Sequence, residues 1–294
     1  MVDRKDFDAG GRVGRVTLIG AGPGAPDLIT VRGLRALMAA DVVLFDALVD
    51  ERLLDGVTAE RIYVGKRNGH HCVPQEEIDA LLLKLARQGK QVARLKGGDP
   101  TVLGRGGEEA MHLARHGVPF EFVPGVTSAV AGPALAGIPV THRGVADSFT
   151  VLTAHRRVEG GGFSIPPYHP STTLVLLMGV STVGQWRAEL REKGYPDTLP
   201  VAFVTEASTE RQSVLTTTVG RAVEDAEAAG VASPSVAVVG EVVRLRETLG
   251  RGMQAGEETA GRVSHICKSS VASSCNRARP RDVASSRRPS PVSR

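Results

Sequence analysis

Short apolar runs alternate with longer amphipathic segments along most of the chain. In the first half, such runs are typical of buried strands and fall at residues 16–20, 41–46, 61–64, 91–95 and 120–123. Between them, hydrophobic side chains recur at helical spacing over residues 30–39, 73–88 and 107–116. Strands that alternate with helices predict an α/β fold with a mostly parallel sheet.

The second half repeats the pattern less regularly. Residues 124–143 are rich in small side chains and predict a short helix at the junction of two domains. We expect strands at 148–153, 173–178, 201–205 and 235–239, helices at 180–193 and 220–229, and a hairpin arm at 211–218. Regular structure is expected to end near Leu249. The predicted organisation is a flexible N-terminus over 1–14, α/β domains over 15–125 and 126–250, and a disordered tail over 251–294.

Composition excludes several classes of protein. The chain has 294 residues, 41% of them hydrophobic, and no run approaches the ~18 apolar residues of a membrane span. The N-terminus carries both charge signs and lacks the apolar core of a signal peptide. Its 3 cysteines are too scattered for a disulfide framework or a zinc site. We therefore expect a cytoplasmic protein without a metal site or membrane contact.

The positive net charge of +4 comes from the end of the chain. Residues 262–294 hold eight basic side chains and one acidic one, which leaves 28 basic and 31 acidic side chains in residues 1–261, a net charge of −3. The folded body is therefore not expected to bind nucleic acid. Residues 262–294 contain no Leu, Phe, Tyr or Trp and cannot offset their ordering entropy, so we expect disorder, with a phosphate-binding arm as the alternative.

The most chemically suggestive stretch is residues 94–109, RLKGGDPTVLGRGGEE. It leaves a predicted strand, passes through five glycines and enters a predicted helix. Asp99 and Arg105 lie among those glycines, which free the backbone to approach a ligand closely. A loop at the carboxyl end of a parallel strand is where α/β sheets bind ligands. A glycine-rich connector without function is the alternative.

An earlier loop resembles a dinucleotide site. Gly20-x-Gly22-x-x-Ala25 follows a predicted strand and satisfies the fingerprint of an NAD(P) enzyme. However, Pro23 and Pro26 fall where that fingerprint begins a helix, and the helical pattern starts only near Thr30. This loop is too long and stiff to set a pyrophosphate on a helix N-terminus. An NAD(P)-dependent oxidoreductase is therefore the weaker alternative.

Four motifs resemble the tetrapyrrole methylase family: GAGPGAPDLITVRG, VGKRNGHHCVPQEEI, RLKGGDPTVLGRGGEE and PGVTSAVAGPALAGIPVTHR. The second and third are similar to the branch that methylates uroporphyrinogen III. The resemblance implies a two-domain fold with S-adenosylmethionine in the cleft between the domains, and a homodimer. It also implies methylation at C2 and C7, which gives precorrin-2 for sirohaem and cobalamin. Another precorrin methyltransferase of the family is the alternative.

The same resemblance implies roles for individual residues. Its cofactor positions are Pro23, Gly97, Gly98, Asp99, Val102, Thr127, Ser128, Met178 and Ala207. Proton transfer falls to Asp46 and Lys66, with Arg105 as a third catalytic candidate that either assists proton removal or anchors a carboxylate. Substrate contacts fall to Arg67, Glu108 and Arg143.

Physical chemistry agrees with several of these roles. A substrate with eight carboxylates calls for guanidinium groups. Asp99 can accept hydrogen bonds from the ammonium or ribose of the cofactor. Two alternatives stay open: Asp46 as a helix cap and Met178 as a core residue. The chain departs from the family pattern at Thr101 and Leu103, which replace aromatic residues, and around Ala207.

Overall fold

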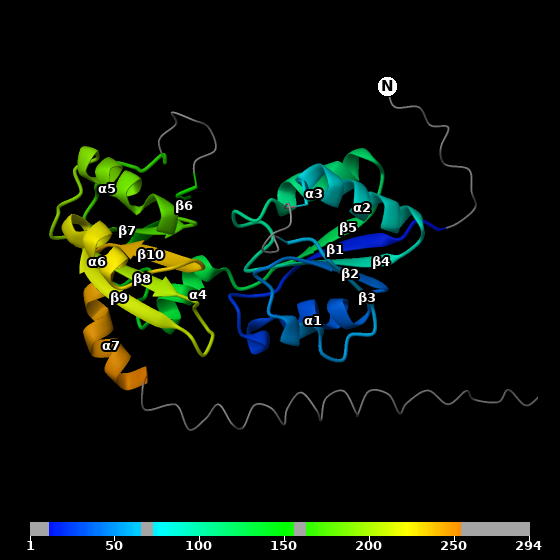
Figure 1. Cartoon of the computed structure of the whole chain (residues 1–294), viewed down its shortest axis with the longest axis horizontal. Coiled ribbons are helices and arrows are strands. Elements are labelled where there is room, and N and C mark those ends of the chain that lie inside the picture. The colour runs from blue at the N-terminus through cyan, green and yellow to red at the C-terminus, as the bar shows by residue number, and fades with distance from the viewer. Residues whose placement is uncertain (1–11, 66–72, 156–162, 254–294) are drawn as a thin grey trace, which may run out of the picture. The chain divides into compact units, whose positions relative to one another are not determined.

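The computed structural model describes residues 12–65, 73–155 and 163–253 (Figure 1). Contacts divide the chain into two compact units, Met1–Gly250 and Arg251–Arg294. The first unit contains two five-stranded sheets. The predicted tail lies outside the described residues, apart from its first three.

The first sheet is wholly parallel, with strand order β3-β2-β4-β1-β5. Its strands are β1 (Arg15–Gly20), β2 (Val42–Phe45), β3 (Glu60–Tyr63), β4 (Gln91–Lys96) and β5 (Phe120–Val123). Its helices are α1 (Val31–Met38), α2 (Gln75–Arg87) and α3 (Gly106–Arg115), with the 3-10 turns η2 (Pro26–Leu28) and η3 (Glu51–Leu54). Every strand and helix predicted for this half is confirmed, with ends that differ by at most two residues.

Helices cover both faces of this sheet, with α1 on one face and α2 and α3 on the other (Figure 1). Val43 packs with Leu37 of α1, whereas its neighbour Val42 packs with Leu82 of α2 and Leu113 of α3. Successive side chains of a strand point to opposite faces, so a strand buried on both faces is largely apolar. This explains the unbroken apolar runs of the sequence.

The second sheet is mixed, with strand order β6-β7-β10-β8-β9. Its strands are β6 (Ser148–Thr153), β7 (Thr172–Leu177), β8 (Pro200–Thr205), β9 (Ser213–Thr218) and β10 (Ser235–Val239). Only β6 and β7 pair in parallel; the other three pairings are antiparallel. The predicted hairpin arm is confirmed as β9, which pairs with β8.

Helix α4 (Ser128–Leu135) contributes to the core on one face of this sheet, and α5 (Val183–Glu192) and α6 (Ala222–Ala228) to the core on the other. The segments predicted as helices at 180–193 and 220–229 begin as the 3-10 turns η4 (Val180–Thr182) and η5 (Val219–Arg221). Two further elements, η6 (Glu241–Leu245) and α7 (Arg246–Met253), carry regular structure past the end predicted near Leu249.

At the other end of the chain, residues 12–14 belong to the fold, although we expected residues 1–14 to be flexible. The Gly14 N–H donates to the Ala86 carbonyl at 2.8 Å, and Val13 packs against the core beneath α2 and α3. Residues 1–11 lie outside the described part.

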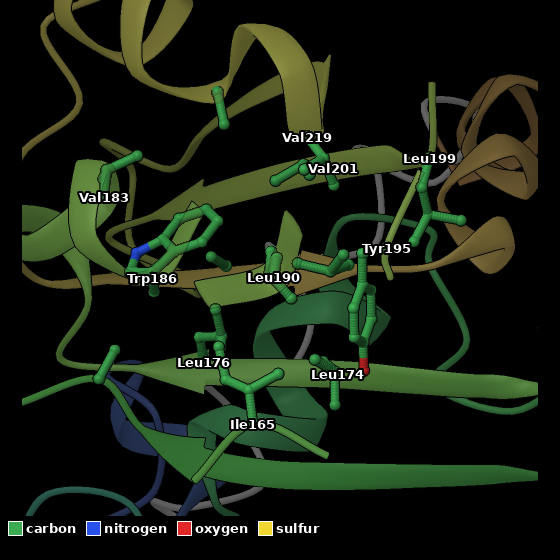
Figure 2. Packing of buried hydrophobic residues seen from close by; sticks show 14 of the residues in the cluster. Ile165, Leu174, Leu176, Val183, Trp186, Leu190, Tyr195, Leu199, Val201 and Val219 are labelled. Carbon is green, nitrogen blue, oxygen red and sulfur yellow. The ribbon is translucent and has the colours of Figure 1, made fainter. Parts of the chain in front are cut away.

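The core of the second sheet is built around Trp186, which is fully buried. Figure 2 shows Trp186 and Leu190 of α5 facing Leu174 and Leu176 of β7. The indole N–H donates to the Gly179 carbonyl at 3.0 Å, so its polar atom is satisfied inside the core. This contact fixes α5 against the loop that follows β7.

Leu190→Ala should lower the free energy of unfolding by about 2–5 kcal/mol, because it opens a cavity in a close-packed core. Trp186 is the single tryptophan of the chain, so its fluorescence during urea denaturation reports this region directly. Leu249→Ala is the control: Leu249 is 43% exposed, and its loss should change stability by no more than about 0.5 kcal/mol. Equal losses in both variants would contradict the described core.

Candidate active site

Glycine backbones meet at the carboxyl ends of β1, β4 and β5. Gly22 and Gly98 exchange backbone hydrogen bonds of 3.2 and 2.7 Å. A Cβ atom on Gly20 would lie 2.4 Å from the Cα atom of Gly125 and 2.6 Å from the Gly98 carbonyl oxygen. No side chain fits at such distances, so these positions require glycine for close backbone approach.

Asp99 joins two of these loops. Its Oδ1 accepts from the Thr101 N–H at 2.8 Å and the Thr101 hydroxyl at 2.6 Å, and its Oδ2 accepts from the Gly125 N–H at 3.0 Å. Burial would raise the pKa of Asp99, but these hydrogen bonds, led by that of the Thr101 side chain, outweigh it and lower the pKa. The carboxylate therefore shapes the loop, and any bond to a cofactor would come in addition.

Other predicted cofactor positions lie beside this loop. Thr127 caps α4, its hydroxyl accepting from the Ala129 N–H at 3.3 Å. A Cβ atom on Gly98 would lie 3.8 Å from both the Ser128 nitrogen and the Thr127 Cα atom. The Val102 N–H donates to the Asp99 carbonyl at 3.3 Å. The structure thus brings Gly98, Asp99, Val102, Thr127 and Ser128 together.

The loop that contains Pro23 contacts a loop of the second sheet. The Ala25 N–H donates to the Ser208 hydroxyl at 2.8 Å. A Cβ atom on Gly24 would lie 2.8 Å from that hydroxyl and 3.1 Å from the Ala207 carbonyl oxygen. Predicted cofactor positions from the two halves of the chain therefore belong to adjoining loops.

The loop after β1 does not have the structure of a dinucleotide site. After β1 the chain makes only the short turn η2, and α1 begins at Val31, capped by the Thr30 hydroxyl. The glycines do not lead directly into a helix N-terminus, as a pyrophosphate site requires. The expectation that the helix starts near Thr30 is confirmed.

Asp46 follows the end of β2 and is partly exposed. Its Oδ1 accepts from the Leu48 N–H at 3.3 Å, and its Oδ2 lies 3.5 Å from Nη2 of Arg94. The 3-10 turn that follows is capped by Asp50, whose Oδ1 accepts from the Arg52 N–H at 2.9 Å. Asp46 is therefore not the helix cap that the alternative reading made of it.

Behind Asp46 lies a buried charge cluster that the sequence reasoning missed. Arg94 and Lys96 of β4 are 3% and 5% exposed, and Glu109 of α3 is fully buried. Glu109 Oε1 lies 3.1 Å from Nε of Arg94 and 3.0 Å from Nζ of Lys96, and it also accepts from the Gln75 amide at 3.2 Å. Burial lowers the pKa of Lys96, the positive charge of Arg94 lowers it further, and Glu109 opposes both.

Arg105 and Glu108 form an exposed pair at the start of α3. Nη2 and Nε of Arg105 donate to Glu108 Oε2 at 2.6 and 3.0 Å, and the two side chains are 53% and 46% exposed. The hydrogen bond from Arg105 to Glu108 is the main cause that raises the pKa of the guanidinium. Arg105 therefore stays cationic and cannot accept a proton.

The remaining residues predicted for the site lie in different surroundings. Met178 follows the last residue of β7, is 49% exposed and has φ +58°, which excludes the core alternative. Gly97 faces Leu48 of the Asp46 loop. Arg143 is exposed, and in the described residues its side chain forms no ion pair with another predicted site residue. Lys66 and Arg67 lie outside the described residues.

Left-handed backbone gathers in the same loops. Of the described non-glycine residues, those with positive φ are Leu103, Arg105, Ser164, Met178, Glu206 and Ser208. All but Ser164 lie in loops that follow β4, β7 or β8. Such conformations cost about 1–3 kcal/mol each and tend to occur where function requires them.

Within the described ranges, no three His, Cys, Asp or Glu side chains form a group suited to a metal ion. The His70–Cys72 stretch lies outside those ranges. The helices that the structure describes include none of the length and apolarity that crossing a membrane requires.

Fold and geometry together describe a two-sheet α/β protein whose candidate site lies at the carboxyl edge of the parallel sheet. A family comparison specifies it further: the tetrapyrrole (corrin/porphyrin) methylase model matches residues 15–223. The chain belongs to this family.

Individual relatives are consistent with membership of this family. A uroporphyrinogen-III C-methyltransferase from Methanocaldococcus jannaschii is 47% identical over 240 residues, which cover 80% of this chain and 99% of that protein. A sirohaem synthase from Chromobacterium violaceum is 47% identical over 252 residues, 83% of this chain and 53% of that protein, so the chain spans about half of the synthase. A Thermus thermophilus uroporphyrin-III C-methyltransferase, crystallised with S-adenosylhomocysteine, is 43% identical, with a TM-score of 0.67 over 79% of this chain and 94% of that one.

Asp99→Asn should lower the free energy of unfolding at neutral pH by about 1–3 kcal/mol, because an amide group replaces an acceptor and leaves a partly buried donor unpaired. The folded pKa of Asp99 is lowered, so its stabilisation is complete above the unfolded pKa of about 3.9 and is lost as pH falls through the folded pKa. The deficit of the variant should therefore shrink below about pH 4. The control is Asp55→Asn at an exposed position; an equal deficit there, measured by urea denaturation, would contradict the assignment.

Proposed function

We propose that this chain is an S-adenosylmethionine-dependent C-methyltransferase that converts uroporphyrinogen III into precorrin-2 by methylation at C2 and C7. The observation that carries the proposal is the 47% identity to the archaeal enzyme over 99% of its length. The geometry supports it, because the loops that contain Asp46 and Arg105 both begin at the carboxyl edge of the parallel sheet.

The described residues fit the cofactor. S-Adenosylmethionine carries an amino-acid head, a sulfonium and an adenosine, and it supplies the methyl group. Such a ligand needs backbone polar groups and polarizable apolar contacts rather than a phosphate cradle. Glycine loops offer the former, and the exposed thioether of Met178 offers the latter. Pro23, Gly97, Asp99, Val102, Thr127, Ser128 and Ala207 complete the proposed site with Gly98.

Arginine side chains bind the substrate in this proposal. The exposed guanidinium of Arg105 anchors one of the eight carboxylates, while Glu108 orients its planar fork. Arg143 is a second exposed guanidinium that can serve the same purpose. Arg67 is assigned to this role on the motif alone.

Asp46 accepts the proton. When a ring carbon gains the methyl group, a carbon–carbon bond forms, the methyl–sulfur bond breaks, and the methylated macrocycle must lose a proton. The Asp46 carboxylate is partly exposed and becomes a carboxylic acid when it takes that proton. Lys66 shares in proton transfer on the motif alone.

The assembly and setting of the enzyme follow the family resemblance. We propose a homodimer in the cytoplasm that binds neither nucleic acid nor a membrane. Sedimentation analysis of the purified chain would test the dimer.

Incubation with uroporphyrinogen III and methyl-labelled S-adenosylmethionine should transfer two methyl groups to each macrocycle and give precorrin-2. Mass spectrometry of the product counts them. Transfer only to a later precorrin would support another methyltransferase of the family and overturn the substrate assignment. Saturable NAD(P) binding without methyl transfer would overturn the proposal altogether.

Arg105→Lys should raise KM for the macrocycle about ten-fold or more with kcat little changed, because lysine keeps the charge but loses the fork that holds a carboxylate. The matched control is Arg191→Lys on α5, where Nε and Nη2 likewise donate to a carboxylate, that of Asp197. Steady-state kinetics separate the two constants. A fall in kcat at constant KM would show instead that Arg105 acts on the transition state.

A further inference from the structure

The faces of β4 explain how two cations come to be buried. Side chains alternate along a strand, and Val92 packs on the face that α2 and α3 cover. Arg94 and Lys96 therefore share that face with Val92. Glu109 on α3 and Gln75 on α2 meet them there, so the contacts follow from strand periodicity and helix placement.

The charges of this cluster do not balance on their own. Arg94 and Lys96 carry two positive charges, and Glu109 carries one negative charge. An unpaired charge inside a protein is strongly unfavourable. Among the described residues, the remaining carboxylate recorded in contact with these cations is Asp46, at 3.5 Å from Arg94 Nη2. Asp46 therefore balances the cluster from the rim of the site.

Every side-chain nitrogen of Arg94 has a polar contact. Its Nε faces Glu109, its Nη1 donates to the carbonyls of Leu95 and Leu44 at 3.2 and 3.5 Å, and its Nη2 faces Asp46. A planar guanidinium fixed on two sides can present its third side in only one direction. Glu109 is thus the buried end of a rigid connection to Asp46.

We propose that Glu109 is a positioning residue for methylation: through Arg94 it holds the Asp46 carboxylate in the orientation that takes the proton from the macrocycle. Glu109 does not touch the substrate. Lys96 and Gln75 fix the Glu109 carboxylate in turn. This proposal rests on the proposed function and adds to it a residue that acts from inside the core.

A double-mutant cycle tests the connection. Asp46→Asn should lower kcat about a hundred-fold or more, as expected for the loss of a general base. Glu109→Gln should lower kcat by up to about a hundred-fold, the scale of a misplaced catalytic group, and leave the affinity for S-adenosylhomocysteine in calorimetry unchanged. In the Asp46→Asn background, Glu109→Gln should cause no further loss, because the path ends at Asp46.

Two further variants secure the interpretation. Glu77→Gln, at an exposed position of α2, is the matched control and should keep wild-type kcat. If Glu109→Gln does not fold, Gln75→Met replaces it, since it removes one bond to Glu109 without removing a charge, and its smaller loss should also vanish in the Asp46→Asn background. Additive losses in a wild type that methylates uroporphyrinogen III would overturn this proposal alone. No methylation by the wild type would overturn the proposed function, and this proposal with it.

Discussion

The candidate site depends on a close approach of backbones at the end of the parallel sheet. A Cβ atom on Gly125 would lie 2.3 Å from the Gly98 carbonyl oxygen and 2.6 Å from the Cα atom of Gly20. The loops after β1, β4 and β5 can touch only because these residues lack side chains. The Asp99 carboxylate then bonds the Gly125 N–H and holds the approach in place. The proposed cofactor positions around Gly98 lie beside this contact.

The strands and helices of the first sheet could be predicted from sequence because the pattern that marks each element lies within its own residues. Apolar runs mark strands covered on both faces, and Thr30 supplies a helix cap that any helical pattern would need. Strand order in the second sheet was not predictable in the same way. The segment 235–239 indicates a buried strand, yet nothing within it specifies that β10 lies between β7 and β8. Such pairings depend on contacts far apart in the sequence.

The candidate site was likewise predictable only in part from the sequence. Motif resemblance gave Asp46 and Arg105, and the structure places Asp46 directly after β2 and Arg105 at the N-terminus of α3. The motif resemblance did not identify Glu109, although the sequence held a sign of its burial. Arg94 and Lys96 share one face of a strand, and Glu109 lies one helical turn before the buried Leu113. Sequence shows such faces but not which helix covers which face. Nor could it show that the Asp99 carboxylate is already bonded to Thr101 and Gly125.

The left-handed residues have a consequence for engineering. Leu103, Arg105, Met178, Glu206 and Ser208 hold strained backbone in the loops around the proposed cofactor and substrate positions. Glycine would relieve that strain at each position, so these loops offer a designer the most obvious gains in thermostability. The same exchange would remove the thioether of Met178 and the guanidinium of Arg105, and with them the chemistry of the site. Thermostable variants are therefore better sought on the exposed helices, where stability and turnover do not compete.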